Sequence, residues 1–172
     1  MRVAFVIGHH KISKGAFSKY LNRYEFDLFK GFECELKEIG DVFYHNSLIP
    51  SYTARQKATA KKTKDYDLVF ELHFNASNGL GNGCEALYYF TNKNTKKVAE
   101  TFCNAYTHYT NTKNRGAKPL YNKKQRGFGF VNEQKTDTVL LEPFFGDNHM
   151  DCLKFNINDF IKSIKHAINE DI

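Results

Sequence analysis

The chain has 172 residues, of which 41% are hydrophobic, 15% aromatic and 26% charged. A chain of this length normally forms one domain, and this composition excludes a disordered or collagen-like protein. No stretch approaches the ~20 consecutive apolar residues of a membrane-spanning helix. We therefore expect a single domain over residues 1–172 without stable membrane association. A monomer is assumed, because the sequence does not determine the oligomeric state.

The formal net charge is +6, from 25 Lys and Arg against 19 Asp and Glu. This excess favours an anionic partner such as nucleic acid, an anionic lipid surface or an acidic wall polymer, and it equally fits a solvated basic surface. Nucleic-acid binding would need basic residues interleaved with aromatic ones on one face. The stretch with Lys57, Lys61, Lys62 and Lys64 carries no aromatic residue after Tyr52, so we expect no nucleic-acid partner.

The start of the chain and its cysteines indicate where the protein is made. The apolar run before Gly8 is too short for a signal peptide, and no small-residue cleavage site follows it. The cysteines are far apart without a CxxC pair, so we expect buried free thiols. Both observations predict synthesis in a reducing cytoplasm without a signal peptide. The cysteines are Cys34, Cys84, Cys103 and Cys152.

In the first half of the chain, short β-branched and aromatic runs alternate with helical periodicity. Apolar residues predict one helix from Leu21 to Ile39, which Gly40 would end. A lysine-rich surface helix is expected over Tyr52–Lys64. The strands expected here are Val3–Ile7, Asp41–His45 and Asp67–Phe74, the last followed by a polar loop over Asn75–Gly83.

The second half continues this alternation. Strands are predicted over Cys84–Phe90 and Thr138–Phe145, with a helix over Thr95–Tyr109 between them. The segment Asn111–Asn132 lacks periodicity and is expected to be a long functional loop. Asn148 would cap one last helix. Its expected inward residues are Leu153, Ile157, Phe160 or Ile161, Ile164 and Ile168. Such alternation predicts an α/β fold with helices covering a largely parallel sheet.

Polar residues gather where the predicted strands end, which is where ligand sites form in open α/β sheets. His9 and His10 follow the first strand, His73 lies at the end of the third, and Glu142 lies in the last. Glu25 falls on the apolar face of the first helix, where a carboxylate needs a partner or a metal.

Two histidines and one carboxylate form a common catalytic zinc site. His9, Glu25 and His73 could supply these ligands, with Glu142 as a nearby base. The alternative is that these are ordinary polar residues paired with backbone or lysines, since no short motif such as HExxH is present. The other histidines are expected to be surface or ordinary helix residues, namely His45, His108, His149 and His166.

Several segments in order carry a resemblance: GHH, KGA, Glu25, ELHFNA, GCEALYYF and VLLEPFFGDN. They resemble the zinc-dependent N-acetylmuramoyl-L-alanine amidases that cleave peptidoglycan, in the form carried by phage endolysins. The resemblance implies a six-stranded mixed sheet flanked by helices and one Zn²⁺ per chain. It also implies His9, Glu25 and His73 as the zinc ligands, and Glu142 as the catalytic acid/base.

The sequence departs from that family at two positions. His10 and Lys11 follow His9, where the family usually has two glycines, which leaves open whether His9 or His10 is the ligand. Glu71 stands where the family often has Ser. By strand alternation Glu71 lies on the side of His73, where it could orient that imidazole, and Asn75 is a second candidate for such support.

Arg115 and Arg126 lie in the predicted long loop, where they could bind a peptide carboxylate or simply be solubilising residues. Taken together, these features predict a zinc hydrolase that cleaves the amide between N-acetylmuramic acid and L-alanine. Peptidoglycan is the expected partner, reached at the bacterial wall after release from the cytoplasm. The alternatives are another zinc amidohydrolase or peptidase and a basic nucleic-acid-binding domain.

Overall fold

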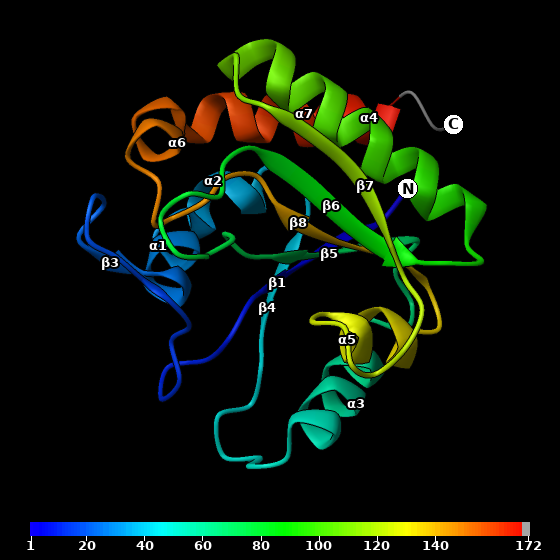
Figure 1. Cartoon of the computed structure of the whole chain (residues 1–172). Coiled ribbons are helices and arrows are strands. Elements are labelled where there is room, and N and C mark those ends of the chain that lie inside the picture. The colour runs from blue at the N-terminus through cyan, green and yellow to red at the C-terminus, as the bar shows by residue number, and fades with distance from the viewer. Residues whose placement is uncertain (170–172) are drawn as a thin grey trace.

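The computed structural model describes residues 1–169, which form one α/β domain around a six-stranded sheet (Figure 1). Neighbouring strands are parallel except β6 and β8, which are antiparallel. The predicted fold class is therefore confirmed, while the end of the predicted domain, 170–172, lies outside the described residues. In spatial order the strands are β4 (Asp41–Tyr44), β1 (Val3–Ile7), β5 (Leu68–Leu72), β8 (Asp137–Glu142), β6 (Cys84–Tyr89) and β7 (Asn114–Leu120).

Helices cover both faces of this sheet (Figure 1). One face packs against α1 (Glu25–Lys30), α2 (Glu33–Lys37), α4 (Lys93–Thr110), α6 (His149–Lys154) and α7 (Ile157–Asn169). The other face lies toward α3 (Tyr52–Lys62) and α5 (Phe128–Glu133). A small hairpin of β2 (Phe17–Ser18) and β3 (Arg23–Tyr24) precedes α1.

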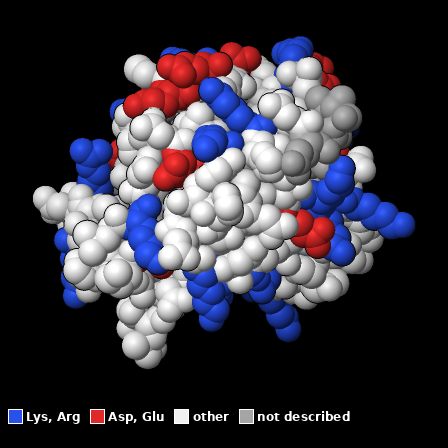
Figure 2. Space-filling view, turned by 90° about the horizontal axis from the view of Figure 1, so that it is seen from above, with Lys and Arg blue, Asp and Glu red and all other residues white. Residues whose placement is uncertain are grey.

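The outer surface carries charges of both signs. Figure 2 looks onto the side where α4 and α7 lie, and Lys and Arg are spread around it with Asp and Glu between them. Among the described residues, no helix combines the length and apolar character needed to span a bilayer.

The core explains why the first strand is apolar at every position. In β1, Phe5 and Ile7 join the cluster toward α4 and α7, whereas Val6 joins the cluster toward α5. A strand covered on both faces has no solvent-facing residues and loses the polar alternation of a one-sided strand. All five residues of β1 are accordingly buried.

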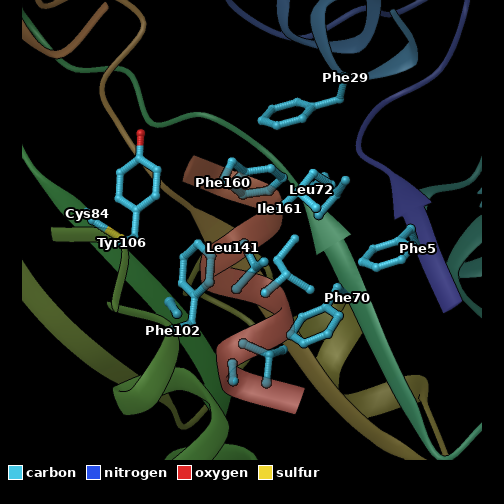
Figure 3. Packing of buried hydrophobic residues seen from close by; sticks show 14 of the residues in the cluster. Phe5, Phe29, Phe70, Leu72, Cys84, Phe102, Tyr106, Leu141, Phe160 and Ile161 are labelled. Carbon is cyan, nitrogen blue, oxygen red and sulfur yellow. The ribbon is translucent and has the colours of Figure 1, made fainter. Parts of the chain in front are cut away.

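Aromatic packing holds the central strands in place. Phe5 and Phe70 stack with ring centroids 5.8 Å apart, and Phe160 meets the ring of Phe102 edge-on at 5.8 Å (Figure 3). Truncating a buried ring of this kind to Ala typically costs ~3–5 kcal/mol. The strand ends that carry the polar residues are therefore held in place by a well-packed core.

The predicted single helix from Leu21 to Ile39 is wrong. The chain forms β3, then α1, and after a break at Gly31 and Phe32 it forms α2. Phe32 has φ −105° and ψ 20°, outside the helical region, so the helix does not continue through it. Apolar residues three or four apart also occur when two short helices bury the same side, so the periodicity could not reveal the break.

The long loop predicted over Asn111–Asn132 is also wrong, because it contains β7 and the start of α5. Strand β7 lies at the edge of the sheet, where a half-exposed strand needs no apolar alternation and tolerates Pro119. The polar composition of β7 therefore gives no strand pattern in the sequence.

The last predicted helix is two helices, separated at Phe155 and Asn156. Asn148 caps the first of them, as expected, by accepting the Asp151 backbone N–H at 3.1 Å. Leu153 is 66% exposed and does not belong to the buried stripe. Among the cysteines, three are buried free thiols as predicted, whereas Cys34 is exposed.

Candidate metal centre and active site

A cavity of about 870 Å³ opens where β1, β5 and β8 end, on the side of α3 and α5. The carboxyl ends of parallel strands meet at one edge of a sheet, so side chains from distant parts of the chain converge there. His9, Glu25, His73 and Glu142 all line this cavity.

His9, Glu25 and His73 form a close polar cluster in the cavity. Nε2 of His9 lies 3.1 Å from Oε2 of Glu25, and Nδ1 of His73 lies 2.7 Å from Oε1. One ligand atom from each residue lies within 4.8 Å of the other two. Glu25 is only 4% exposed, and the backbone N–H groups of Ala16 and Phe74 also donate to it.

The backbone is shaped to bring these groups together. Gly15 has φ +80°, and a Cβ at this position would lie 2.5 Å from the His9 ring and 2.6 Å from Oε2 of Glu25. His9 itself adopts φ 63°, a left-handed conformation that costs a non-glycine residue ~1–3 kcal/mol. Such strain typically occurs where the surroundings force a functional side chain into position.

Electrostatics keep Glu25 ionised despite its burial. Burial alone would raise its pKa, but hydrogen bonds from His73 and His9 outweigh burial and lower the pKa to about 2. Burial likewise favours neutral His73, yet the charges and hydrogen bonds of Glu71 and Glu25 raise the pKa of His73 well above its usual value. The cluster is thus an anionic pocket that attracts a positive charge, either a proton or a metal ion.

His9 and His10, which the sequence could not separate, lie differently. His9 joins Glu25 and His73, whereas Nδ1 of His10 accepts the Ser13 backbone N–H at 3.3 Å. His10 also lines the cavity but is buried, and this burial lowers its pKa. The geometry thus favours His9 as the ligand.

Glu71 lies next to His73, on the side predicted by strand alternation. Its Oε2 is 3.3 Å from Nε2 of His73, and its Oε1 is 2.7 Å from Nε2 of His45. Nδ1 of His45 in turn lies 2.9 Å from the Thr59 hydroxyl on α3. The prediction that His45 is a surface or ordinary helix residue is therefore wrong, because it is 6% exposed and bonded at both ring nitrogens.

Glu142 lies at the end of β8, outside the three-residue cluster. Nδ2 of Asn75 donates to its Oε2 at 3.0 Å. Burial raises the pKa of Glu142 to about 8, with a further increase from Glu85 and an opposing effect of His73. A carboxyl group with a pKa near neutrality can both accept and donate a proton, which is what acid/base catalysis requires.

Of the two arginines, Arg126 lines the cavity, whereas Arg115 donates from Nε to Glu85 at 2.6 Å. Sequence reasoning missed Glu85 and His45. Glu85 could have been found from the sequence, because a carboxylate is unusual inside an apolar run such as that of β6. His45 ends a predicted strand, which is the same signal that singled out His73.

A family model described as N-acetylmuramoyl-L-alanine amidase, Amidase_3, matches residues 3–172. The chain belongs to this amidase family. Peptidoglycan is the substrate of the Amidase_3 family, whose members are generally zinc-dependent. No curated protein is significantly similar to the chain in sequence.

Solved amidase structures share the fold. The catalytic domain of the CD27L endolysin, which targets Clostridia difficile, is 26% identical with a TM-score of 0.79, over 99% of this chain and 97% of that one. CwlV from Bacillus (Paenibacillus) polymyxa var. colistinus is 21% identical with a TM-score of 0.75, over 99% and 97%. An amidase from Clostridium difficile 630 is 21% identical with a TM-score of 0.74, over 98% and 95%.

The residues of this amidase fit a zinc ion. Neutral imidazole and carboxylate are ligands that suit Zn²⁺, and two histidines with one carboxylate leave a position open for water or substrate. Glycine at position 15 leaves the space beside His9 and Glu25 that a side chain would fill. Glu71 also provides a carboxylate at the far nitrogen of His73, a common arrangement around metal-bound histidines.

Proposed function

We propose that this Amidase_3 domain is a zinc-dependent amidase of the endolysin type. It would cleave the amide between the lactyl group of N-acetylmuramic acid and L-alanine of the stem peptide. The observation that carries the zinc proposal is the cluster of His9, Glu25 and His73 in a cavity that also holds Glu142. When bound there, Zn²⁺ would polarise the scissile carbonyl and lower the pKa of a water from 15.7 toward ~7.

The protein's own groups perform the proton transfers in this proposal. Glu142 takes a proton from the attacking water and delivers it to the nitrogen of the leaving amine. Asn75 holds the Glu142 carboxyl by its Nδ2–H. Glu71 holds the ring of His73 from the side opposite Glu25, so that Nδ1 faces the metal position.

The product distinguishes this reaction from other wall hydrolysis. We expect purified protein acting on purified peptidoglycan to release free amino groups without new reducing ends, and the new amino-terminal residue to be L-alanine. Another amino-terminal residue would favour a zinc peptidase instead. Full activity in a strong chelator would contradict the zinc proposal.

The endolysin part of the proposal draws support from the similarity to the CD27L catalytic domain. An endolysin of this kind would accumulate in the host cytoplasm and reach the wall after a membrane lesion. Fractionation of producing cells tests this. Efficient export of the unmodified chain would favour a secreted amidase.

A further inference from the structure

Glu85 stands opposite the proposed acid/base in the sheet. Because β6 is antiparallel to β8, its first residues lie at the edge where β8 ends, and the register pairs Glu85 with Glu142. Glu85 is 8% exposed. Two acidic residues that face each other across neighbouring strands, one buried and the other partly buried, normally repel and destabilise a sheet.

Two further side chains stabilise this pair. Nδ2 of Asn75 donates to both carboxyl groups, at 2.6 Å to Oε1 of Glu85 and 3.0 Å to Oε2 of Glu142. On the other side, Nε of Arg115 donates to Oε2 of Glu85 at 2.6 Å. The Arg115 guanidinium also lies over the Phe145 ring, 5.0 Å from its centroid, which limits its freedom to leave Glu85.

We propose that Glu85 is a positioning residue for the amidase reaction, which holds the Glu142 carboxyl for proton transfer and is itself held by Arg115. This inference rests on the proposed function, in which Glu142 moves the proton. In this arrangement Arg115 pairs with Glu85, and Glu85 beside Glu142 raises the pKa of the Glu142 carboxyl, after the larger effect of burial. Arg115 then acts on the reaction through Glu85 and not by binding substrate.

The charged groups around Glu142 come from four segments. Glu85 of β6 and Glu25 of α1 favour its protonated form, whereas His73 after β5 opposes it. Arg115 of β7 acts by way of Glu85. Removing Glu85 and removing Arg115 should therefore shift the proton affinity of Glu142 in opposite directions. If the ion pair between Glu85 and Arg115 only stabilised the pairing of β6 with β7, we would expect no such opposite shifts.

The test is the pH dependence of kcat/KM for the zinc-loaded protein and two variants. Glu85→Gln removes a negative charge, so the midpoint of the acid limb should fall by about one pH unit, and kcat should fall about tenfold with little change in KM. Arg115→Gln removes a positive charge, so the midpoint should rise. Glu85→Asp should restore part of the wild-type profile.

Controls separate positioning from stability. Glu100→Gln is matched to Glu85→Gln, because Glu100 is also paired with a cation, Lys96, but lies on α4 away from the cavity. It should leave the profile unchanged. Zinc content is measured at each pH, so that metal loss is not mistaken for titration of Glu142. If Glu85→Gln does not fold, the positioning role is tested by Arg115→Gln alone, in which the midpoint of the acid limb should rise.

Unshifted midpoints in both variants, with only a lower melting temperature, would overturn the positioning role. A raised KM in Arg115→Gln at an unchanged midpoint would instead make Arg115 a substrate-binding residue. If the wild-type protein does not cleave peptidoglycan, the proposed function fails. If the wild type is active and its variants keep its profile, only the role of Glu85 fails.

Discussion

Oε1 of Glu25 lies 2.7 Å from Nδ1 of His73, although the two residues are 48 positions apart in the chain. Glu25 is the first residue of α1, and His73 directly follows β5, so this contact joins the start of a helix to the end of a strand. It explains why a carboxylate is tolerated with only 4% exposure.

We expect elemental analysis of the purified protein to find about one zinc per chain, since three ligands and an open position define one site. His9→Ala and His73→Ala should each lose most of the metal. His10→Ala is the matched control, because it removes the neighbouring imidazole, which lies outside the cluster. Retention of zinc by His9→Ala and its loss by His10→Ala would reverse the assignment.

Glu142→Gln should keep the fold and the zinc but lose on the order of 10²–10⁴ in rate, because glutamine cannot accept the proton. Zinc content and circular dichroism of the variant check that only the chemistry is lost. Loss of the metal together with activity would place Glu142 among the ligands.

The same variant should be more stable than the wild type in the metal-free state near neutral pH. Folding raises the pKa of Glu142 from 4.5 to about 8, so between these values the folded chain holds a proton that the unfolded chain has released. Stability contributed by this group is therefore lost as the pH rises through that window, by up to about 3 kcal/mol at pH 7. Glu142→Gln removes this penalty.

Urea unfolding of metal-free wild type and Glu142→Gln at pH 4 and pH 7 measures the effect. The variant should gain free energy of unfolding at pH 7 and show little difference at pH 4, where the wild-type group is protonated in the folded state and largely so in the unfolded state. Equal differences at both values would mean that packing and not ionisation separates the two proteins.

Glu71 links His45 to His73, so replacing it should weaken the metal site without touching a ligand. We expect Glu71→Ser, the residue common in the family, to lower zinc affinity by ~10–100-fold, as measured by competition with a chelator. In that background His45→Ala should have little further effect, because His45 acts through Glu71. His108→Ala, an exposed histidine on α4, serves as the control.

The net charge of +6 should matter for encounter with an anionic wall. Lys57, Lys61, Lys62 and Lys64 are exposed on or just after α3, the helix that flanks the cavity. Activity on intact walls should fall steeply with salt, as the Debye length shrinks from ~10 Å at 0.1 M to ~3 Å at 1 M. Activity on a small neutral muramyl peptide should stay nearly constant.

Replacing those four lysines by glutamine should reproduce the loss on walls at low salt and spare the small substrate. This variant separates steering from chemistry, since the active-site cluster is unchanged. Equal salt sensitivity on both substrates would mean that salt acts on the site or on stability, and the steering idea would be abandoned.

Local pattern was enough for much of this protein. β1, β5, β6 and β8 were predictable because each is a short, mainly apolar run of residues that is largely buried in the sheet. The order of short motifs indicated the family and the four residues that the cavity brings together. The polar edge strand β7 was not predictable, because a half-exposed strand imposes no apolar alternation on its residues.

Only the tertiary structure decided which of these residues meet. Adjacent in sequence, His9 and His10 point to different partners, because the left-handed backbone at His9 turns its ring toward Glu25. The contact of Glu71 with His45 joins residues 26 positions apart in the chain, and that of Glu85 with Arg115 joins residues 30 positions apart. Residue identity and periodicity describe one segment at a time, whereas hydrogen bonds and charge interactions depend on distances of a few ångströms that arise only when the sheet assembles.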